Sequence, residues 1–279
     1  MIPKIIHFCW LSSDPFPKEV QEYMQSWSNY FPEYKIMHWK LETDNVGENI
    51  WVKQAFQNKK YAFAADYIRL FALYHYGGVY LDTDVEVCKN SRIIEGLPYL
   101  IGSEGNGIIE AAVLGAQKNA DWIKCCLDYY DDREFLKKDG GFDMRTLPSI
   151  MMQQLTKKYT ITEKNYLNAK ISGRENQLYM LPKEFLSPKN MGTGEIHATE
   201  NTITIHHFNM SWIEGSGKKI ADIKRILIKW FGVNFIQKYI RFFKLKQLKN
   251  TFSDEILEKA GLILKSSKGN FIDRFRNRI

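Results

Sequence analysis

The first forty residues alternate between short apolar runs and a segment with helical periodicity. "KIIHFCWL" (4–11) is an apolar run that ends at "SSDPFP", a pattern typical of a buried strand. Residues 18–31 place apolar side chains three and four apart, as a helix does, and "YKIMHW" (34–39) predicts a second strand. This strand–helix–strand order predicts a parallel sheet covered by helices.

A helix-rich segment follows and leads directly into another strand. Residues 51–78 have a helical pattern and end in a Gly-Gly pair, which is a common stop signal for a helix. "VYLDTDVEV" (79–87) predicts a strand, with Asp82 and Asp84 at the point where it leaves the core. Ligands of open α/β sheets bind at the carboxyl ends of strands. The two aspartates are therefore expected at a binding edge.

The rest of the chain predicts further elements and a change of character near the end. We expect strands at 97–104, 107–116 and 202–208, and helices at 119–132 and 145–159. After Gly215 the pattern is helical to the end, without repeats or a low-complexity linker. We therefore predict an α/β catalytic domain over residues 1–215 and a helical extension over residues 216–279.

Charge separates the same two regions. The chain has 279 residues, 44% of them hydrophobic, which is ample for a packed core and excludes global disorder. From Lys218 to Ile279, 16 Lys/Arg stand against 5 Asp/Glu, within a total net charge of +7. A mildly acidic body therefore carries a strongly basic tail.

The tail has the pattern of a basic amphipathic helix. Its apolar stripe, with lysines opposite, consists of Ile220, Ile223, Leu227, Trp230 and Phe231. Such a segment either lies on an anionic membrane surface or packs against the catalytic domain. Nucleic acid is not an expected partner, because no recognised binding motif accompanies the charge.

The termini and cysteines indicate where the protein works. The first residues lack the pattern of a signal peptide, and no stretch approaches the ~18 apolar residues of a spanning helix. Cys9, Cys88, Cys125 and Cys126 lack a paired spacing, so we interpret them as reduced thiols. We expect a cytoplasmic protein that is peripheral on the inner face of the cell membrane when its tail binds lipid.

Four charged residues are candidates for one site. Asp82 and Asp84 are so close that a bound cation or a shared proton is favoured over two free charges. An Asp-x-Asp pair alone is weak, since about one chance match is expected in a chain of this length. Asp66 and Arg69 share a helix face, as an ordinary ion pair also would, but their helix turns directly into the Asp82 strand. An arginine facing carboxylates, with room for a cation, suits a diphosphate and the hydroxyls of a sugar.

These segments resemble glycosyltransferase family 32. The resemblance rests on "AADYIRLFALYHYGGVYLDTDVEV" (64–87), the opening "IPKIIHFCW" (2–10) and "HHFNMSW" (206–212). The family contains sugar transferases of GT-A fold, including capsular polysaccharide enzymes and mannosyltransferases, and is related to glucosylating toxins. The resemblance implies a GT-A-like, Rossmann-type nucleotide-sugar-binding domain. It also implies a retaining, metal-dependent hexosyltransferase of surface or capsular polysaccharide synthesis. Such an enzyme transfers the sugar of a UDP- or GDP-sugar donor to a glycan acceptor, which in some cases is linked to a lipid.

The resemblance also implies roles for the four charged residues. Asp82 and Asp84 would bind Mn²⁺ or Mg²⁺ against the donor diphosphate. Asp66 and Arg69 would hold the hydroxyls of the donor sugar and the adjacent phosphate. All four are thereby expected to take part in catalysis.

Four further residues would contact the donor. The resemblance implies that Trp10 stacks on the nucleotide base and that Tyr80 lies close to the nucleoside. Ser211 and Trp212 would close over the diphosphate. An indole face suits the first role because a base that leaves water needs a stacking partner.

A histidine is expected to complete the metal site. His206 and His207 are adjacent on a predicted strand, so they point to opposite faces and at most one easily reaches the metal. Alternation does not decide which one does. "EAAVLGA" places Glu110 where many relatives have asparagine, so Glu110 either faces a sugar or is an ordinary edge residue.

Two other functions remain open. "VYLDTDVEV" also fits the nucleophile motif of haloacid-dehalogenase phosphatases, with Asp82 as the nucleophile, although that motif normally lies on the first strand of its fold. The basic tail also fits a non-enzymatic protein that binds membranes.

Overall fold

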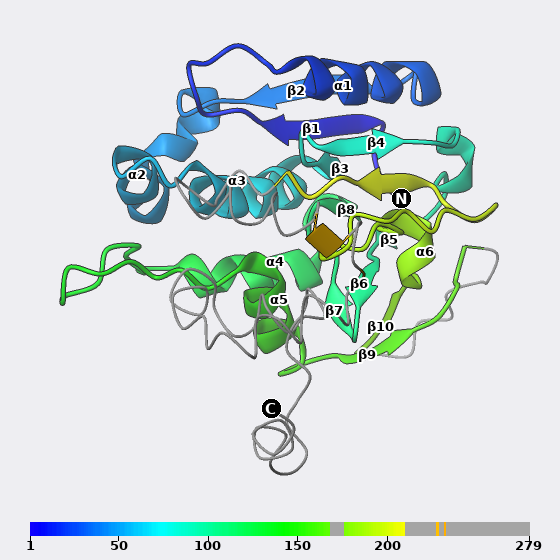
Figure 1. Cartoon of the computed structure of the whole chain (residues 1–279). Helices are drawn as coiled ribbons and strands as arrows, with labels where there is room; N and C mark the ends of the chain where they lie inside the picture. The colour runs from blue at the N-terminus through cyan, green and yellow to red at the C-terminus, as the bar shows by residue number, and fades with distance from the viewer. Residues whose placement is uncertain (168–175, 210–226, 229–231, 233–279) are drawn as a thin grey trace, which may run out of the picture. The chain divides into compact units, whose positions relative to one another are not determined.

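The computed structural model describes residues 1–167, 176–209, 227, 228 and 232. Its central sheet has five strands in the order β2-β1-β3-β8-β5 (Figure 1). The bounds are β1 (Ile5–Cys9), β2 (Lys35–Trp39), β3 (Gly78–Leu81), β5 (Tyr99–Leu100) and β8 (Val113–Ala116). The predicted α/β fold class, with a sheet that contains parallel strands, is confirmed.

The sheet is mixed rather than wholly parallel. β1 pairs in parallel with both β2 and β3, as predicted, but β8 is antiparallel to both β3 and β5. The prediction of a parallel sheet is therefore right for β1, β2 and β3 and wrong for β8, which runs opposite to the other strands. The reason lies in the connections, since β1, β2 and β3 are joined through helices whereas β5 reaches β8 through a short stretch of strands and turns.

Helices and short strands surround the sheet. The helices are α1 (Lys18–Tyr30), α2 (Ile50–Gln57), α3 (Tyr61–Tyr76), α4 (Asp121–Leu127), α5 (Leu147–Leu155) and α6 (Lys183–Leu186). Short 3-10 helices span Thr43–Glu48, Ser91–Ile93 and Asp128–Tyr130. The remaining strands are β4 (Val85–Val87), β6 (Ser103–Gly105), β7 (Ile108–Ile109), β9 (Thr160–Glu163), β10 (Gln177–Met180) and β11 (Thr204–His206). The sequence pattern did not predict β9, β10 or α6.

Helix α3 is the buried element that carries Asp66 and Arg69. Apolar residues occur on all its sides, as expected of a helix enclosed in a core, and Ile68, for example, is fully buried. The helix ends at Gly77 with φ 64°, followed by Gly78 with φ 109°. A Cβ on Gly78 would lie 2.6 Å from the carbonyl oxygen of Ile5. The glycine pair therefore lets the chain reverse and pair β3 directly with β1.

A buried histidine holds this reversal in place. The indole Nε1 of Trp39 donates to His7 Nδ1 at 3.0 Å, and His7 Nε2 lies 2.7 Å from the carbonyl oxygen of Gly77. Burial lowers the pKa of His7 to about 4, so the ring is neutral at physiological pH. With Nδ1 accepting, the neutral ring donates from Nε2 and links two strands to the end of α3.

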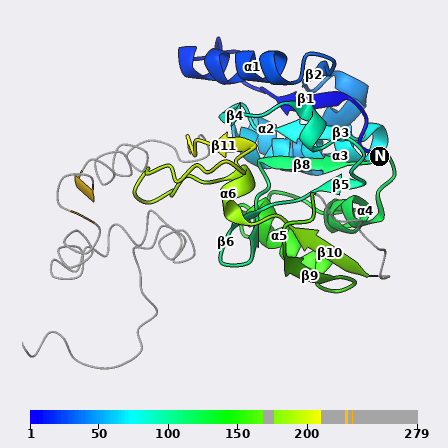
Figure 2. The ribbon, with the colours of Figure 1, turned by 90° about the vertical axis from the view of Figure 1, so that its right-hand side faces the viewer.

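The predicted strand over residues 79–87 is broken at the aspartates. β3 ends at Leu81, and the Val85 amide donates to the Asp82 carbonyl at 3.0 Å, which closes a turn. The strand continues as β4, which pairs with β11 instead of the central sheet (Figure 2). Helix α1 fixes β4 from its other side, since Trp27 Nε1 donates to the Val85 carbonyl at 2.7 Å. The continuous strand was therefore wrong, and the turn is what presents Asp82 and Asp84.

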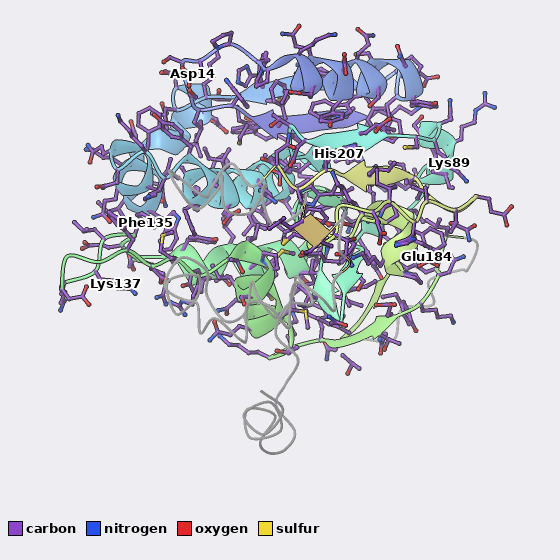
Figure 3. The ribbon with its side chains drawn as sticks, in the orientation of Figure 1. Asp14, Lys89, Phe135, Lys137, Glu184 and His207 are labelled. Carbon is purple, nitrogen blue, oxygen red and sulfur yellow. The ribbon has the colours of Figure 1, made fainter. Side chains whose placement is uncertain are left out.

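The chain divides into two compact units. The first contains Met1–Lys189 and His197–Trp212, and the second contains Asn190–Ile196 and Ile213–Ile279. Within the first unit, the loop between α4 and α5 extends outward, with Phe135 at its base and Lys137 near its outer end (Figure 3).

The predicted domain boundary at residue 215 lies outside the described residues and stays a prediction. The same holds for most of the basic tail, in which only residues 227, 228 and 232 are described. Among the helices that the structure describes, each is too short or too polar to cross a membrane.

Candidate active site

The turn that carries the two aspartates lies at the carboxyl edge of the parallel strands. β1 and β3 run side by side with His7 opposite Tyr80, so the residues that follow both strands reach the same edge. The Asp82 amide donates to the carbonyl of Ala112 at 2.9 Å, which ties the turn to the chain just before β8. Trp10 follows β1 at this edge, just outside the observed strand although the predicted strand included it.

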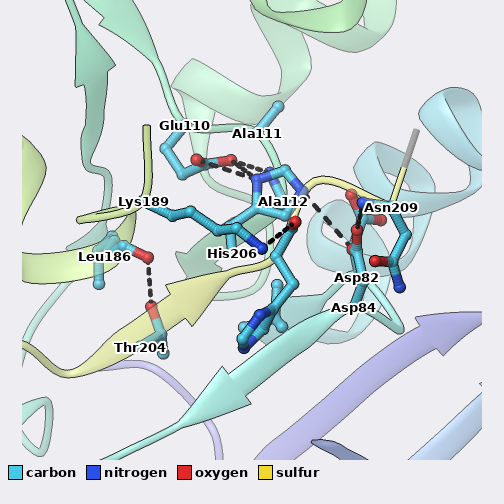
Figure 4. A network of polar contacts seen from close by, with 12 residues as sticks. Asp82, Asp84, Glu110, Ala111, Ala112, Leu186, Lys189, Thr204, His206 and Asn209 are labelled. Atoms are coloured by element: carbon cyan, nitrogen blue, oxygen red, sulfur yellow. Dashed lines mark hydrogen bonds and ion pairs between the residues drawn. The ribbon is translucent and has the colours of Figure 1, made fainter. Parts of the chain in front are cut away.

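Asp82, Asp84 and His206 come together there. One ligand atom from each residue lies within 4.8 Å of the others. His206 Nε2 is 3.5 Å from Asp84 Oδ1, and the Asn209 amide donates to Asp84 Oδ2 at 2.7 Å (Figure 4). The turn after β3 and the end of β11 therefore converge, although more than 120 residues separate them along the chain.

Arg69 connects Asp82 to helix α3. Its Nη2 donates to Asp82 Oδ1 at 2.9 Å and lies 3.4 Å from Asp66 Oδ1, while Nη1 donates to the carbonyl of Ala111. The guanidinium carbon lies 4.5 Å from the centre of the Tyr80 ring. The pair with Asp66 is thus more than an isolated ion pair of one helix, because the same guanidinium fixes Asp82.

Burial and charge shift the pKa values of these groups in different directions. Burial raises the pKa of Asp66 to about 7, although Arg69 opposes the shift. Burial also raises the pKa of Asp82, again against Arg69. For Asp84, burial acts upward, but His206 outweighs it and holds the pKa at about 2. The turn therefore combines a carboxyl group with a raised pKa, Asp82, and one with a lowered pKa, Asp84.

Glu110 is the third acidic group at this place. Its side chain is only 2% exposed. Oε1 accepts from the amide of Ala112 at 2.9 Å, and Oε2 lies 3.2 Å from His206 Nδ1 (Figure 4). Burial would lower the pKa of His206, but Glu110 and Asp84 together raise it well above its ordinary value. Because Glu110 is buried against His206, it is not an ordinary edge residue, and its contact with a sugar stays a prediction.

His207 points away from this cluster. Its Nε2 lies 2.9 Å from Glu86 Oε2, and its ring stacks on Tyr23 with centroids 4.3 Å apart. Neighbouring residues at the end of a strand face opposite sides, so only one histidine can join the aspartates. The structure places His206 there, and His207 is not brought to the predicted metal site.

The predicted donor-binding residues are placed unequally. Trp10 is half-buried, donates from Nε1 to the Asp14 carbonyl at 2.8 Å and packs on Phe16. Tyr80 is 1% exposed and lies under Arg69, so in this structure its ring offers no face to a nucleoside. Ser211 and Trp212 lie outside the described residues. Base stacking by Trp10 stays a prediction.

The three converging side chains fit a divalent cation. Two carboxylates and one imidazole form a mixed oxygen and nitrogen donor set, and carboxylate oxygens suit Mg²⁺ and Mn²⁺. An imidazole nitrogen favours first-row transition metals over Mg²⁺, which prefers oxygen. Of the two predicted ions, the donor set therefore fits Mn²⁺ better.

Comparison with known proteins supports the predicted resemblance over part of the chain. Residues 17–100 match the family model described as "Glycosyltransferase sugar-binding region containing DXD motif". This match includes α3 and the turn with Asp82 and Asp84. This part of the chain is therefore similar to the sugar-binding region of glycosyltransferases with a DXD motif, in line with the resemblance to family 32.

Curated relatives match a part of the chain of similar size. Mannosyl phosphorylinositol ceramide synthase SUR1 of Saccharomyces cerevisiae is 40% identical over 91 residues, which are 30% of this chain and 23% of that protein. Inositol phosphoceramide mannosyltransferase 2 of Schizosaccharomyces pombe is 37% identical over 93 residues, 30% of this chain and 25% of that protein. The matched region thus spans about a quarter of the length of each relative.

Two solved structures are similar at a lower level. One is "PaToxG Glycosyltransferase", with a TM-score of 0.44, 19% identity, and coverage of 56% of this chain and 69% of that chain. The other is a glycosyltransferase involved in the glycosylation of the major capsid of PBCV-1, with a TM-score of 0.38 and 12% identity. That match covers 79% of this chain and 98% of the other.

Proposed function

We propose that this protein is a metal-dependent glycosyltransferase that moves a sugar from a nucleotide-sugar donor to a glycan acceptor. The observation that carries the proposal is the convergence of Asp82, Asp84 and His206 within 4.8 Å, inside a sugar-binding region with a DXD motif. Arg69 adds a positive charge beside Asp82. Carboxylates, an imidazole and a guanidinium at one strand edge suit a cation bound to a diphosphate.

The side chains divide the work of holding the donor. Asp82, Asp84 and His206 would hold Mn²⁺, which supplies neutralisation of the negative charge that grows on the leaving diphosphate. Arg69 orients Asp82 through the 2.9 Å contact and keeps its guanidinium in the same region. Asp66, with a pKa raised by burial to about 7, can exchange hydrogen bonds with a sugar hydroxyl as donor or acceptor.

We further propose that transfer retains the anomeric configuration by a front-face reaction. The acceptor oxygen bonds to the anomeric carbon on the face from which the diphosphate departs, and the bond from that carbon to the diphosphate oxygen breaks. The proton of the acceptor hydroxyl passes to an oxygen of the leaving phosphate. This route needs no side chain as covalent nucleophile, so the site requires only groups that bind and orient.

The relatives suggest which donor and acceptor to test first. Both relatives are named for mannose transfer and for an inositol phosphoceramide lipid. We therefore propose a hexosyl donor, with GDP-mannose tested beside UDP-sugars, and an acceptor glycan that is carried on a lipid. A role in surface or capsular polysaccharide synthesis agrees with such an acceptor.

The basic tail supports a membrane location. Residues 218–249 contain ten Lys/Arg against Asp222 alone, and each contact with an anionic surface contributes up to ~1 kcal/mol. We propose that the tail attaches the enzyme peripherally to the cytoplasmic face of the membrane. Truncation after Gly217 should abolish binding to anionic vesicles at low salt and leave donor hydrolysis measurable. Full-length protein that ignores such vesicles would contradict this attachment.

One assay separates the proposed enzyme from the two alternatives. Release of nucleoside diphosphate is measured across a panel of nucleotide sugars, with Mn²⁺ and with chelator. A transferase hydrolyses one donor slowly and only with the cation, whereas a phosphatase using Asp82 would release phosphate from simple monoesters. A non-enzymatic membrane protein would do neither.

A further inference from the structure

His206 contacts a carboxylate through each of its two ring nitrogens. Nε2 faces Asp84 Oδ1 at 3.5 Å, and Nδ1 lies 3.2 Å from Glu110. An imidazole can bind a cation through one nitrogen only when the proton is on the other. The arrangement around Nδ1 therefore controls what Nε2 can do.

We propose that Glu110 is a positioning residue that holds a proton on Nδ1 of His206, so that the proton that leaves when a cation binds between Asp82 and Asp84 is the one on Nε2, whose lone pair then faces the cation. This inference rests on the proposed metal-dependent function and extends it to a residue outside the DXD motif. Glu110 acts only through His206.

Glu110 is itself held in place. Its backbone amide donates to the carbonyl of Gly102 at 2.8 Å, and its Oε1 accepts from the Ala112 amide at 2.9 Å. With the side chain 2% exposed, rotation away from His206 would leave a buried carboxylate without the Ala112 amide and the His206 ring as partners. The carboxylate is therefore a fixed acceptor for Nδ1–H.

The segment before β8 that contacts Glu110 also supports Asp82. Ala112 accepts from the Asp82 amide at 2.9 Å through its carbonyl and donates to Glu110 through its amide. One residue thus links the backbone of the DXD turn to the carboxylate that orients His206. Carboxylate partners of this kind fix the tautomer and the ring orientation of metal-binding histidines.

The chain contains a matched control for this proposal. Glu86 contacts His207 through a carboxylate oxygen, 2.9 Å from Nε2. Glu86 and His207 are therefore a second carboxylate–imidazole pair, at the histidine next to His206 in the sequence. His207 lies outside the cluster of Asp82, Asp84 and His206. Neutralising Glu86 removes an equivalent charge without touching the orientation of His206.

The test is a titration of the full chain with Mn²⁺ alone, in which free Mn²⁺ is followed by electron paramagnetic resonance. Glu110→Gln should weaken Mn²⁺ binding about 10- to 100-fold, the loss typical of removing a carboxylate partner from a ligating histidine. Glu86→Gln should bind as the wild type does. In a His206→Ala background, Glu110→Gln should cause no further loss, since the two residues act as one unit.

Several outcomes would overturn the proposal. Unchanged Mn²⁺ affinity in Glu110→Gln contradicts it, as does an equal loss in the His206→Ala background. A variant that melts at a lower temperature yet binds Mn²⁺ normally shows that Glu110 is merely structural. Asp84→Asn distinguishes failure of the Glu110 proposal from failure of the proposed metal site. If Asp84→Asn weakens Mn²⁺ binding and Glu110→Gln does not, only the role of Glu110 is contradicted. If Asp84→Asn also binds normally, the proposed metal site itself fails.

Discussion

Two adjacent histidines, each beside a glutamate, have opposite surroundings in this protein. His206 lies between Asp84 and Glu110, whereas His207 stacks on Tyr23 and contacts Glu86. Glu110 is 2% exposed and Glu86 is 41% exposed, so solvent screens the second pair far more than the first. Both pairs consist of a histidine and a glutamate. The side of β11 that each histidine faces decides which pair lies at the proposed metal site.

The pKa values of the two rings record this difference. Burial lowers the pKa of His207, and the hydrogen bond to Glu86 does not compensate. Burial acts in the same direction on His206, but two buried carboxylates overcome it and raise the pKa. The pair of His207 and Glu86 is therefore a packing contact, whereas the pair of His206 and Glu110 is part of a charged cluster.

The largest effect is expected from the aspartates that share the site with His206. Asp82→Asn and Asp84→Asn should each lower kcat on the order of 1,000-fold, because charge neutralisation by the cation contributes several kcal/mol to transfer. Steady-state release of nucleoside diphosphate measures this loss. Glu86→Gln, which removes a carboxylate two residues past Asp84, is the control and should keep near-normal turnover. Undiminished kcat in both aspartate variants would remove the site from catalysis.

Exchanging the two histidines for alanine tests the comparison itself. His206→Ala should weaken Mn²⁺ binding about 100-fold, since a ligand atom is lost. His207→Ala should leave Mn²⁺ binding unchanged and lower the free energy of unfolding by about 1 kcal/mol, through the lost ring stacking on Tyr23. Mn²⁺ titration and thermal unfolding of both variants measure the contrast. Equal Mn²⁺ affinities for the two variants would refute it.

Arg69 tests whether Asp82 must be held in one orientation. A guanidinium reaches Asp82 and the Ala111 carbonyl at once, which a single ammonium cannot reproduce. Arg69→Lys should therefore lower kcat/KM about 10- to 100-fold although the charge is kept. Lys124→Arg, on the exposed face of α4, is a control that should leave kcat/KM unchanged. Wild-type kcat/KM in Arg69→Lys would mean that only the charge matters.

The smallest effect concerns Asp66 and pH. Its folded pKa of about 7 lies above the ordinary value of 3.8, so wild-type stability should fall as pH rises from about 4 to about 7. Asp66→Asn removes this titration, and should be more stable than the wild type by about 1–2 kcal/mol at pH 8, with a smaller difference at pH 4. Denaturant unfolding at both pH values gives the difference. A pH-independent difference for Asp66→Asn would contradict the raised pKa.

Local patterns predicted the parallel half of the fold well. Helical spacing located α1, and the Gly-Gly pair marked the end of α3, because both signals arise within a few residues of one another. The antiparallel strand β8 and the turn inside residues 79–87 were not predicted correctly. Those features depend on pairing between distant segments, such as β4 with β11, which periodicity does not report.

The residues of the candidate site that are close together in the sequence were also predictable, whereas the contacts from distant segments were not. Asp66, Arg69, Asp82 and Asp84 lie close together in the sequence and close together in the structure. Which histidine joins them was undecided, because one residue of register at the end of β11 determines it. The contact of Glu110 with His206 spans 96 residues, and its only local signal is a carboxylate within the apolar run "GIIEAAVLGA".

The central claim is that Asp82, Asp84 and His206 form the metal site of a glycosyltransferase. Its most direct test is release of nucleoside diphosphate from a panel of nucleotide sugars, compared between wild type, His206→Ala and His207→Ala across a Mn²⁺ titration. We predict that one donor is turned over only with the cation, that His206→Ala needs at least about 10-fold more Mn²⁺, and that His207→Ala follows the wild type. Turnover that survives chelation, or a Mn²⁺ dependence shared by both variants, would contradict the account.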